Sequence, residues 1–152
     1  MASLDEILFS RAGELYSSLF ERELISPSFS YGYTISQTSA YNAIGGEADD
    51  PYRVLSEVRA YLDRVKKNGL SRSDFERAKR VMYAEFVKSF DSTDNIANNL
   101  LSFICEDSEL LSYADILDGI TFEEVEALLA TSFDESATAL SIVFPRNQTS
   151  SQ

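Results

Sequence analysis

The chain has 152 residues, a formal net charge of −12 and 44% hydrophobic residues, which is enough apolar material for the core of one globular domain. It has no histidine and a single cysteine, Cys105, which excludes histidine-ligated zinc or haem and any triad with an imidazole base within this chain. One cysteine forms no internal disulfide, and no apolar run approaches the roughly 18 residues of a membrane span, so we expect a cytoplasmic protein.

Charge is distributed unevenly along the sequence. Residues 53–80 contain nine Lys or Arg and four Asp or Glu, whereas residues 91–135 contain twelve Asp or Glu and no Lys or Arg. Such an acidic block repels phosphate backbones and anionic lipids, and the basic stretch is short and partly neutralised. We therefore expect neither a nucleic-acid partner nor a membrane partner.

The first third of the chain predicts a helix followed by a hairpin. Apolar residues recur at helical spacing over about residues 4–23, at Leu4, Ile7, Leu8, Ala12, Leu15 and Leu19. Pro27 ends this helix, and the strict alternation of residues 29–35 is typical of a half-buried strand. Residues 41–44 form a second strand, which ends at Gly45-Gly46, so the pair is predicted to be an antiparallel hairpin.

Helices dominate the rest of the chain. Asp50-Pro51 is a typical helix start and Asn68-Gly69 a typical end. Ser73 with Glu76 predicts a capping box for a next helix. Its expected buried face consists of Phe75, Ala78, Met82, Phe86 and Phe90. Three shorter helices are predicted over about 94–105, 109–117 and 122–130, the last opened by a Thr121–Glu124 capping box, and a closing strand over 139–144.

These elements predict an α+β fold, with a small antiparallel sheet of about three strands packed against several helices. We expect a single domain over residues 1–145 and a disordered polar tail over 146–152.

Structural roles account best for most residues that suggest chemistry. The acidic clusters around Glu106, Asp115 and Glu123 lack the ligand spacing of a calcium loop, and Gly45-Gly46 lacks a phosphate-loop pattern. No histidine is present to activate Cys105, so a buried thiol is the simpler interpretation. The hairpin aromatics, Tyr31 among them, could line a peptide groove, although core packing explains most of them.

Several short motifs occur in an order that resembles one known family, the insulinase-type or pitrilysin-type zinc peptidases and their processing-peptidase relatives. The motifs are Glu14-Leu15-Tyr16, Leu19-Phe20-Glu21, Leu24-Ile25, Ser28-Phe29-Ser30-Tyr31, Ile44-Gly45-Gly46, Asp50-Pro51, Gly69-Leu70-Ser71, Asp74-Phe75, Ala78-Lys79, Ile120-Thr121 with Val125, and Leu140-Ser141-Ile142-Val143-Phe144-Pro145. The resemblance covers nearly the whole chain.

The resemblance implies copies of one α+β domain, paired around a peptide-holding chamber. The catalytic copy carries an inverted His-x-x-Glu-His zinc motif, so this histidine-free chain resembles the non-catalytic copy and the trailing part of a longer polypeptide. The implied partners are a peptide substrate and a zinc-bearing sister domain, in the same polypeptide or in a paired subunit. Zinc would then belong to the sister domain, and this chain would hold no cofactor and no catalytic or metal-binding residue of its own.

The resemblance also implies two candidates for substrate binding, Arg22 and Tyr31. In active relatives the non-catalytic copy supplies an Arg and, seven residues later, a Tyr that hold the substrate carbonyl. Here Arg22 stands seven residues before Phe29, so the guanidinium matches and the phenol does not. If the motif aligns two residues earlier, Phe20 takes the place of the Arg; Tyr31 substitutes for the Tyr only if the strand register shifts.

Two other classes of function stay open at this point. The acidic helices between Asp94 and Ala130 could make the chain a self-standing interaction module for a basic partner. A metal-free carboxylate enzyme is the third alternative, because residues distant in sequence, such as Glu106 and Asp115, can meet in space.

Overall fold

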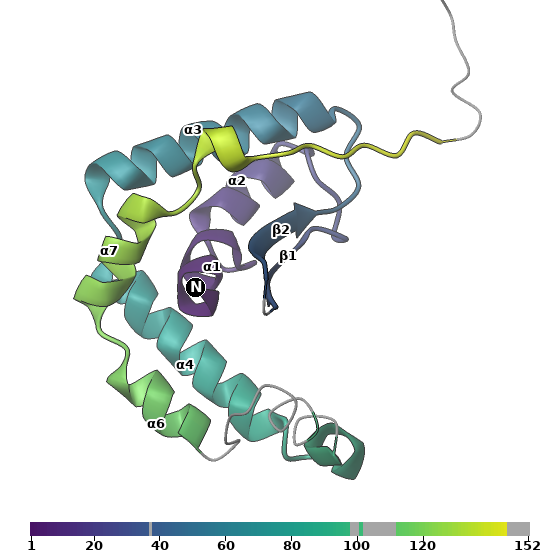
Figure 1. The fold of residues 1–152 in the computed structure, drawn as a ribbon. Coiled ribbons are helices and arrows are strands. Elements are labelled where there is room, and N and C mark those ends of the chain that lie inside the picture. The colour runs from purple at the N-terminus through teal and green to yellow at the C-terminus, as the bar shows by residue number, and fades with distance from the viewer. Residues whose placement is uncertain (37, 98–100, 102–111, 146–152) are drawn as a thin grey trace, which may run out of the picture.

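The computed structural model describes the chain except for residues 37, 98–100, 102–111 and 146–152. Figure 1 shows its elements, and the α+β class is as predicted. In chain order the elements are α1 (Ala2–Phe9), α2 (Glu14–Glu21), β1 (Ser30–Ile35), β2 (Ala40–Gly45), α3 (Pro51–Asn68), α4 (Arg72–Lys88), α6 (Ser112–Gly119), α7 (Phe122–Thr131) and the 3-10 turn η1 (Glu135–Ala137). None of the described helices has the length and apolar character needed to cross a membrane.

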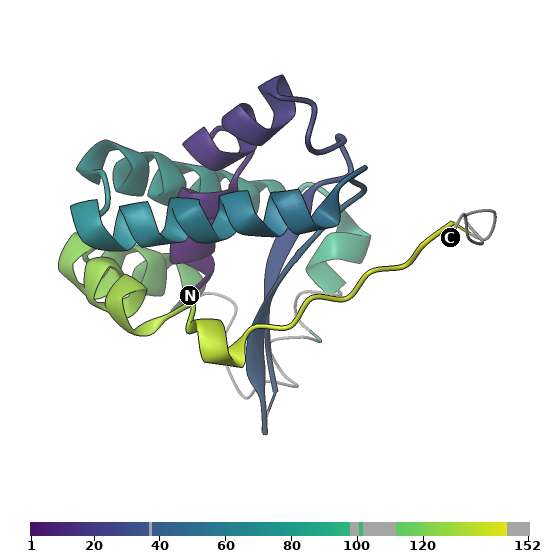
Figure 2. The ribbon, with the colours of Figure 1, turned by 90° about the horizontal axis from the view of Figure 1, so that it is seen from above.

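Helix α1 lies at the centre of the domain. Leu4, Leu8 and Phe9 are at most 1% exposed, and every residue from Ser3 to Phe9 is buried. Helices α2, α4 and α7 and strand β1 all contact α1, which Figures 1 and 2 show enclosed among them. A helix buried on all sides is typical of a core element, so α1 is the support on which the other elements pack.

The predicted first helix over residues 4–23 is wrong, because the structure has two helices separated by a turn. The turn closes with a hydrogen bond from the Gly13 N–H to the Ser10 carbonyl oxygen at 2.8 Å. A Cβ at Gly13 would approach that same oxygen to 3.0 Å, so the turn is tight enough to favour glycine. Apolar spacing continues across the turn, which is why periodicity alone did not reveal the break.

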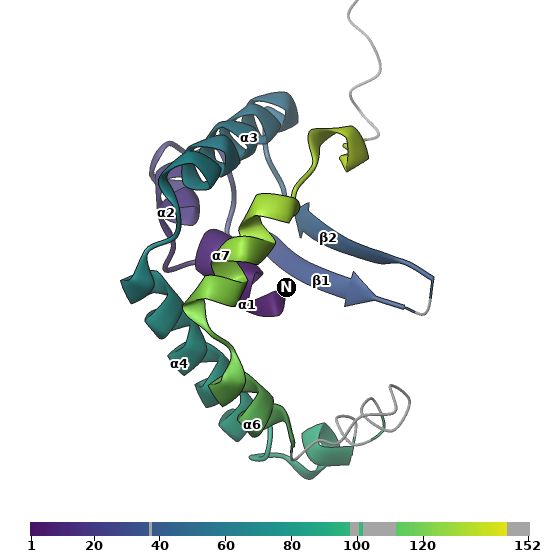
Figure 3. The same cartoon turned by 60° about the vertical axis from the view of Figure 1, so that its left-hand side comes forward.

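The antiparallel hairpin is confirmed, with β1 and β2 paired from Ser30 opposite Gly45 to Ile35 opposite Ala40. Alternation places Tyr31, Tyr33, Ile35, Asn42 and Ile44 on one face. The part of this face near α1 is half-buried, whereas Ile35 towards the tip is 63% exposed. Figure 3 shows the hairpin extending beyond the helices.

The predicted closing strand over 139–144 is also wrong. Residues 139–145 form no strand, and the segment extends past the hairpin and out of the domain, as Figures 1 and 2 show, with Val143 93% exposed. Alternating apolar residues favour extended backbone, but a strand also needs a partner edge. In the described part of the chain only β1 and β2 pair, so the sheet has two strands rather than about three.

Helix ends agree with the sequence at α3 and α7 and differ at α4. The Asp50 carboxylate accepts the Arg53 N–H at 3.0 Å, and the Thr121–Glu124 capping box opens α7, both as predicted. The cap of α4 is Ser71, whose hydroxyl accepts the Asp74 N–H at 3.4 Å, so the predicted Ser73 capping box is wrong. The cap therefore lies at Ser71 rather than at Ser73, because the hydroxyl of Ser71 can accept the same kind of hydrogen bond.

The remaining helix predictions are met in part. Of the expected buried face of α4, Phe75, Ala78 and Met82 are buried, whereas Phe86 is half-buried and Phe90 is 37% exposed. Residues 93–97 are helical, and most of the predicted helix 94–105 lies outside the described residues. The start of the predicted helix 109–117 and the predicted tail 146–152 lie outside them as well.

The central place of α1 can be tested with two matched truncations. We expect Leu8→Ala to lower the free energy of unfolding by about 3 kcal/mol, because Leu8 is fully buried and its truncation leaves a cavity in the core. Leu140→Ala, in the exposed closing segment, should change it by less than about 0.5 kcal/mol. Urea denaturation measures both; equal losses would contradict the described arrangement.

Candidate functional site

Arg22 lies immediately after α2 and forms a two-pronged ion pair with α3. Its guanidinium donates to the two carboxylate oxygens of Glu57, at 2.9 Å and 2.5 Å. The hydrogen bond to Glu57 raises the pKa of Arg22, and Arg22 lowers the pKa of Glu57. Both side chains are partly exposed, at 40% and 33%, so the pair is accessible to water and to exchange with another carbonyl or carboxylate.

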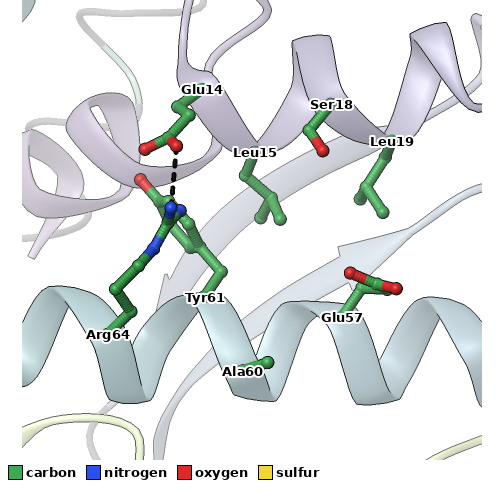
Figure 4. A pocket seen from close by; sticks show the side chains of 8 residues that line it. All are labelled: Glu14, Leu15, Ser18, Leu19, Glu57, Ala60, Tyr61 and Arg64. Carbon is green, nitrogen blue, oxygen red and sulfur yellow. Dashed lines mark ion pairs between the residues drawn. The ribbon is translucent and has the colours of Figure 1, made fainter.

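A groove of about 260 Å³ lies beside this pair, between α2 and α3. Figure 4 shows its lining, with Leu15 and Leu19 of α2 facing α3 and an ion pair between Glu14 and Arg64, 2.9 Å apart, towards one end. Burial is the main reason that the pKa of Tyr61, also in the lining, rises to about 12. Because Glu14 already neutralises Arg64, the groove offers a mixed apolar and polar surface rather than a free cation for an anionic ligand.

Tyr31 lies on the hairpin and points to α1 rather than to the groove. Its hydroxyl donates to the buried carboxylate of Glu6, and its ring lies 6.2 Å from that of Phe9. Burial raises the pKa of Tyr31, and the hydrogen bond and charge of Glu6 raise it further, with Glu85 and Asp5 adding to the effect. Tyr31 is therefore a neutral donor whose single O–H is already engaged.

Asp5 and Asn42 form a second polar contact between α1 and the hairpin. The Asn42 side-chain N–H donates to Asp5 Oδ1 at 2.8 Å. Asp5 is only 2% exposed, and burial raises its pKa from 3.8 to about 6 although the positively charged amino terminus lowers it. The other two oxygens of this pair, Asp5 Oδ2 and Asn42 Oδ1, are buried without a hydrogen-bond partner in the described structure.

Arg22 and Tyr31 thus have separate partners on separate helices, Glu57 on α3 and Glu6 on α1. Their contact with a peptide stays a prediction. Sequence reasoning missed Asp5, Glu6 and Asn42, because the polar residues of an amphipathic helix are expected at its surface and α1 is buried on all sides. The one available signal is that Asn42 interrupts the apolar residues of the second strand.

The described residues offer no site that fits zinc. It has no histidine, Cys105 lies outside the described residues, and the described residues contain no cluster of three or more His, Cys, Asp or Glu that could hold a metal ion. In the acidic helix α7, Glu123 pairs with Arg72 at 2.8 Å and Glu124 completes the helix cap. These two carboxylates therefore have structural partners, as the sequence indicated for this cluster.

Comparison with known proteins matches the chain to a curated relative. The chain is 25% identical over 147 residues to the uncharacterized zinc protease YmfH of Bacillus subtilis (strain 168). That alignment covers 97% of this chain and 34% of YmfH, so the chain spans about a third of the relative's length. No protein-family model matches the chain.

Solved structures share the fold. A protein described as an M16-like peptidase from Alicyclobacillus acidocaldarius superposes with a TM-score of 0.78 and 26% identity, over 86% of this chain and 31% of that one. A protease from Helicobacter pylori superposes with a TM-score of 0.68 and 14% identity, over 86% of this chain and 33% of that one. The second likeness shows the fold alone, and the first agrees with the YmfH match in pointing to zinc-protease-like proteins.

The Tyr31–Glu6 contact gives a testable prediction for the hairpin. Tyr31→Phe should lower the free energy of unfolding by about 1–3 kcal/mol, because it leaves a buried carboxylate without its donor. Tyr33→Phe, on the same face and more exposed, is the matched control and should have little effect. Urea denaturation near neutral pH compares them, and a loss no larger for Tyr31 than for Tyr33 would refute the assigned role.

Proposed function

We propose that this chain, which belongs to the insulinase-type zinc peptidase family, is a non-catalytic domain of such a peptidase or of an inactive homologue. In this role it forms part of a peptide-binding chamber opposite a zinc-bearing sister domain, in the same polypeptide or in a paired subunit. One observation carries the proposal: a chain without histidine aligns over 97% of its length with a zinc protease. Since it spans only 34% of that relative, the relative has ample sequence for a separate metal-bearing domain.

The geometry supports unequal roles for the two residues proposed to contact peptide. Among the described residues Arg22 is paired only with the part-exposed Glu57, and an exposed ion pair costs little to open, so its guanidinium can turn to a peptide carbonyl. Tyr31 would have to leave the buried Glu6, which costs about 1–3 kcal/mol for the stranded carboxylate. We therefore propose Arg22 as the main contact and Tyr31 as a support of the hairpin that touches peptide only through its ring.

The absence of metal ligands gives a direct test. After dialysis the isolated chain should retain no stoichiometric zinc by mass spectrometry and should cleave no fluorogenic peptide library, because it has no imidazole to bind or activate the metal. A parallel sample treated with EDTA defines the background of both assays. Stoichiometric zinc together with EDTA-sensitive cleavage would overturn the non-catalytic assignment.

A second candidate, an acidic interaction module, is favoured by the twelve acidic residues without a basic one between residues 91 and 135. The two functions differ in how salt affects partner binding. Association with a histidine-bearing sister domain should persist from about 0.1 M to about 1 M NaCl, although the Debye length falls from about 10 Å to about 3 Å. Binding to one defined basic protein that disappears over this range, measured by calorimetry, would favour the module.

A further inference from the structure

The interface between α1 and the hairpin contains an unusual pair of unsatisfied acceptors. Asp5 and Asn42 are joined by one hydrogen bond, from the amide N–H to Asp5 Oδ1 at 2.8 Å. The two atoms left over, Asp5 Oδ2 and Asn42 Oδ1, are both oxygens, both buried and both without a partner in the described structure. Burying two acceptors without a donor is costly, so their occurrence in one contacting pair needs a physical reason.

One added proton would satisfy both atoms. An ionised carboxylate only accepts hydrogen bonds, whereas a carboxylic acid also carries one O–H donor. A carboxylic acid and a primary amide are complementary: the amide N–H donates to one acid oxygen, and the acid O–H donates to the amide oxygen. Exchanging the assigned positions of the amide N and O leads to the same two-bond ring, so this conclusion does not depend on that assignment.

We propose that Asp5 takes up a proton in the folded domain as the solution becomes more acidic and then forms a two-bond acid–amide ring with Asn42, so that the hairpin docks on α1 more strongly. The ring is a proton-dependent lock at the one place where β2 is hydrogen-bonded to the central helix through side chains. It concerns the stability and position of the hairpin, and it does not depend on the proposed peptidase role.

The surroundings of Asp5 favour its neutral form. Burial is the largest influence and raises the pKa to about 6, and the amino terminus acts in the opposite direction. Helices α2 and α7 supply apolar side chains to the surrounding core, such as Leu19 and Leu129. The other titratable groups at this interface are Glu6 on α1 and Tyr31 on β1, with Glu85 on α4 close enough to act on Tyr31; Arg77 on α4 donates to Ser10, just after the end of α1.

The direction of the pH effect follows from these values. The pKa of Asp5 is higher in the folded chain, about 6, than its ordinary value of 3.8, so folding takes up a proton. The resulting stabilisation is complete below about pH 3.8 and is lost as the pH rises through about 6. The loss of this stabilisation between about pH 5 and about pH 8 lowers the folding equilibrium constant about tenfold.

Asp5→Asn tests the lock, because its amide N–H replaces the acid O–H at every pH. Urea denaturation of the full chain gives the folding equilibrium constants of the variant and of the wild-type chain at each pH. The ratio of the variant's constant to the wild-type constant should rise about tenfold from about pH 5 to about pH 8. Asp63→Asn, on the exposed side of α3, is the matched control and should keep a constant ratio. A ratio for Asp5→Asn that is independent of pH would overturn the proposal.

Carbon-13 NMR of the unchanged chain provides a second test that needs no variant to fold. The carboxyl carbon of Asp5 should titrate with a midpoint at or above about 6, and the side-chain carbonyl carbon of Asn42 should shift with the same midpoint. An Asp5 midpoint near its ordinary value would contradict protonation. An Asn42 carbonyl that does not move while Asp5 titrates would contradict the ring.

Discussion

The burial of helix α1 is the constraint on which the rest of the structure depends. Its side chains are enclosed by α2, α4, α7 and β1, so they must form suitable apolar or polar contacts on every side of the helix. Leu4, Leu8 and Phe9 provide the apolar contacts. Asp5 and Glu6 provide the polar ones, and both are used to hold the hairpin. The hairpin has no other strand beside it in the described residues, so its position rests largely on these contacts.

The sequence correctly predicted the helix caps that depend on contacts between residues close together in the chain. Asp50 with Pro51, and Thr121 with Glu124, cap helices because the interactions involved span only three residues. Where tertiary contacts decide, the sequence was insufficient. The apolar stripe runs through the turn at Gly13, and the alternation of residues 139–144 describes a strand for which the described structure has no partner. Asp5 is buried because α1 is enclosed on all sides, and the periodicity of apolar residues in the sequence does not reveal that enclosure.

At the candidate site, too, the sequence identified residues but not the tertiary contacts that determine their roles. The sequence resemblance selected Arg22 and Tyr31, and it contained no information about their partners, Glu57 and Glu6, which lie 35 and 25 residues away along the chain. Those partners determine what each residue can do. An exposed ion pair leaves Arg22 available to a ligand, whereas a buried carboxylate holds Tyr31 to the core. The difference in burial between the two carboxylates therefore supports different proposed roles, with Arg22 as the peptide contact and Tyr31 as a structural support of the hairpin.

The size and metal content of the natural polypeptide test the central claim most directly. An antibody raised against this chain can capture that polypeptide from the source cells for electrophoresis and zinc analysis. The account predicts a species much heavier than 17.0 kDa, or one associated with a separate histidine-containing subunit, together with zinc held outside this chain if the peptidase is active. A species of 17.0 kDa that works alone, with no histidine-containing partner, would contradict it.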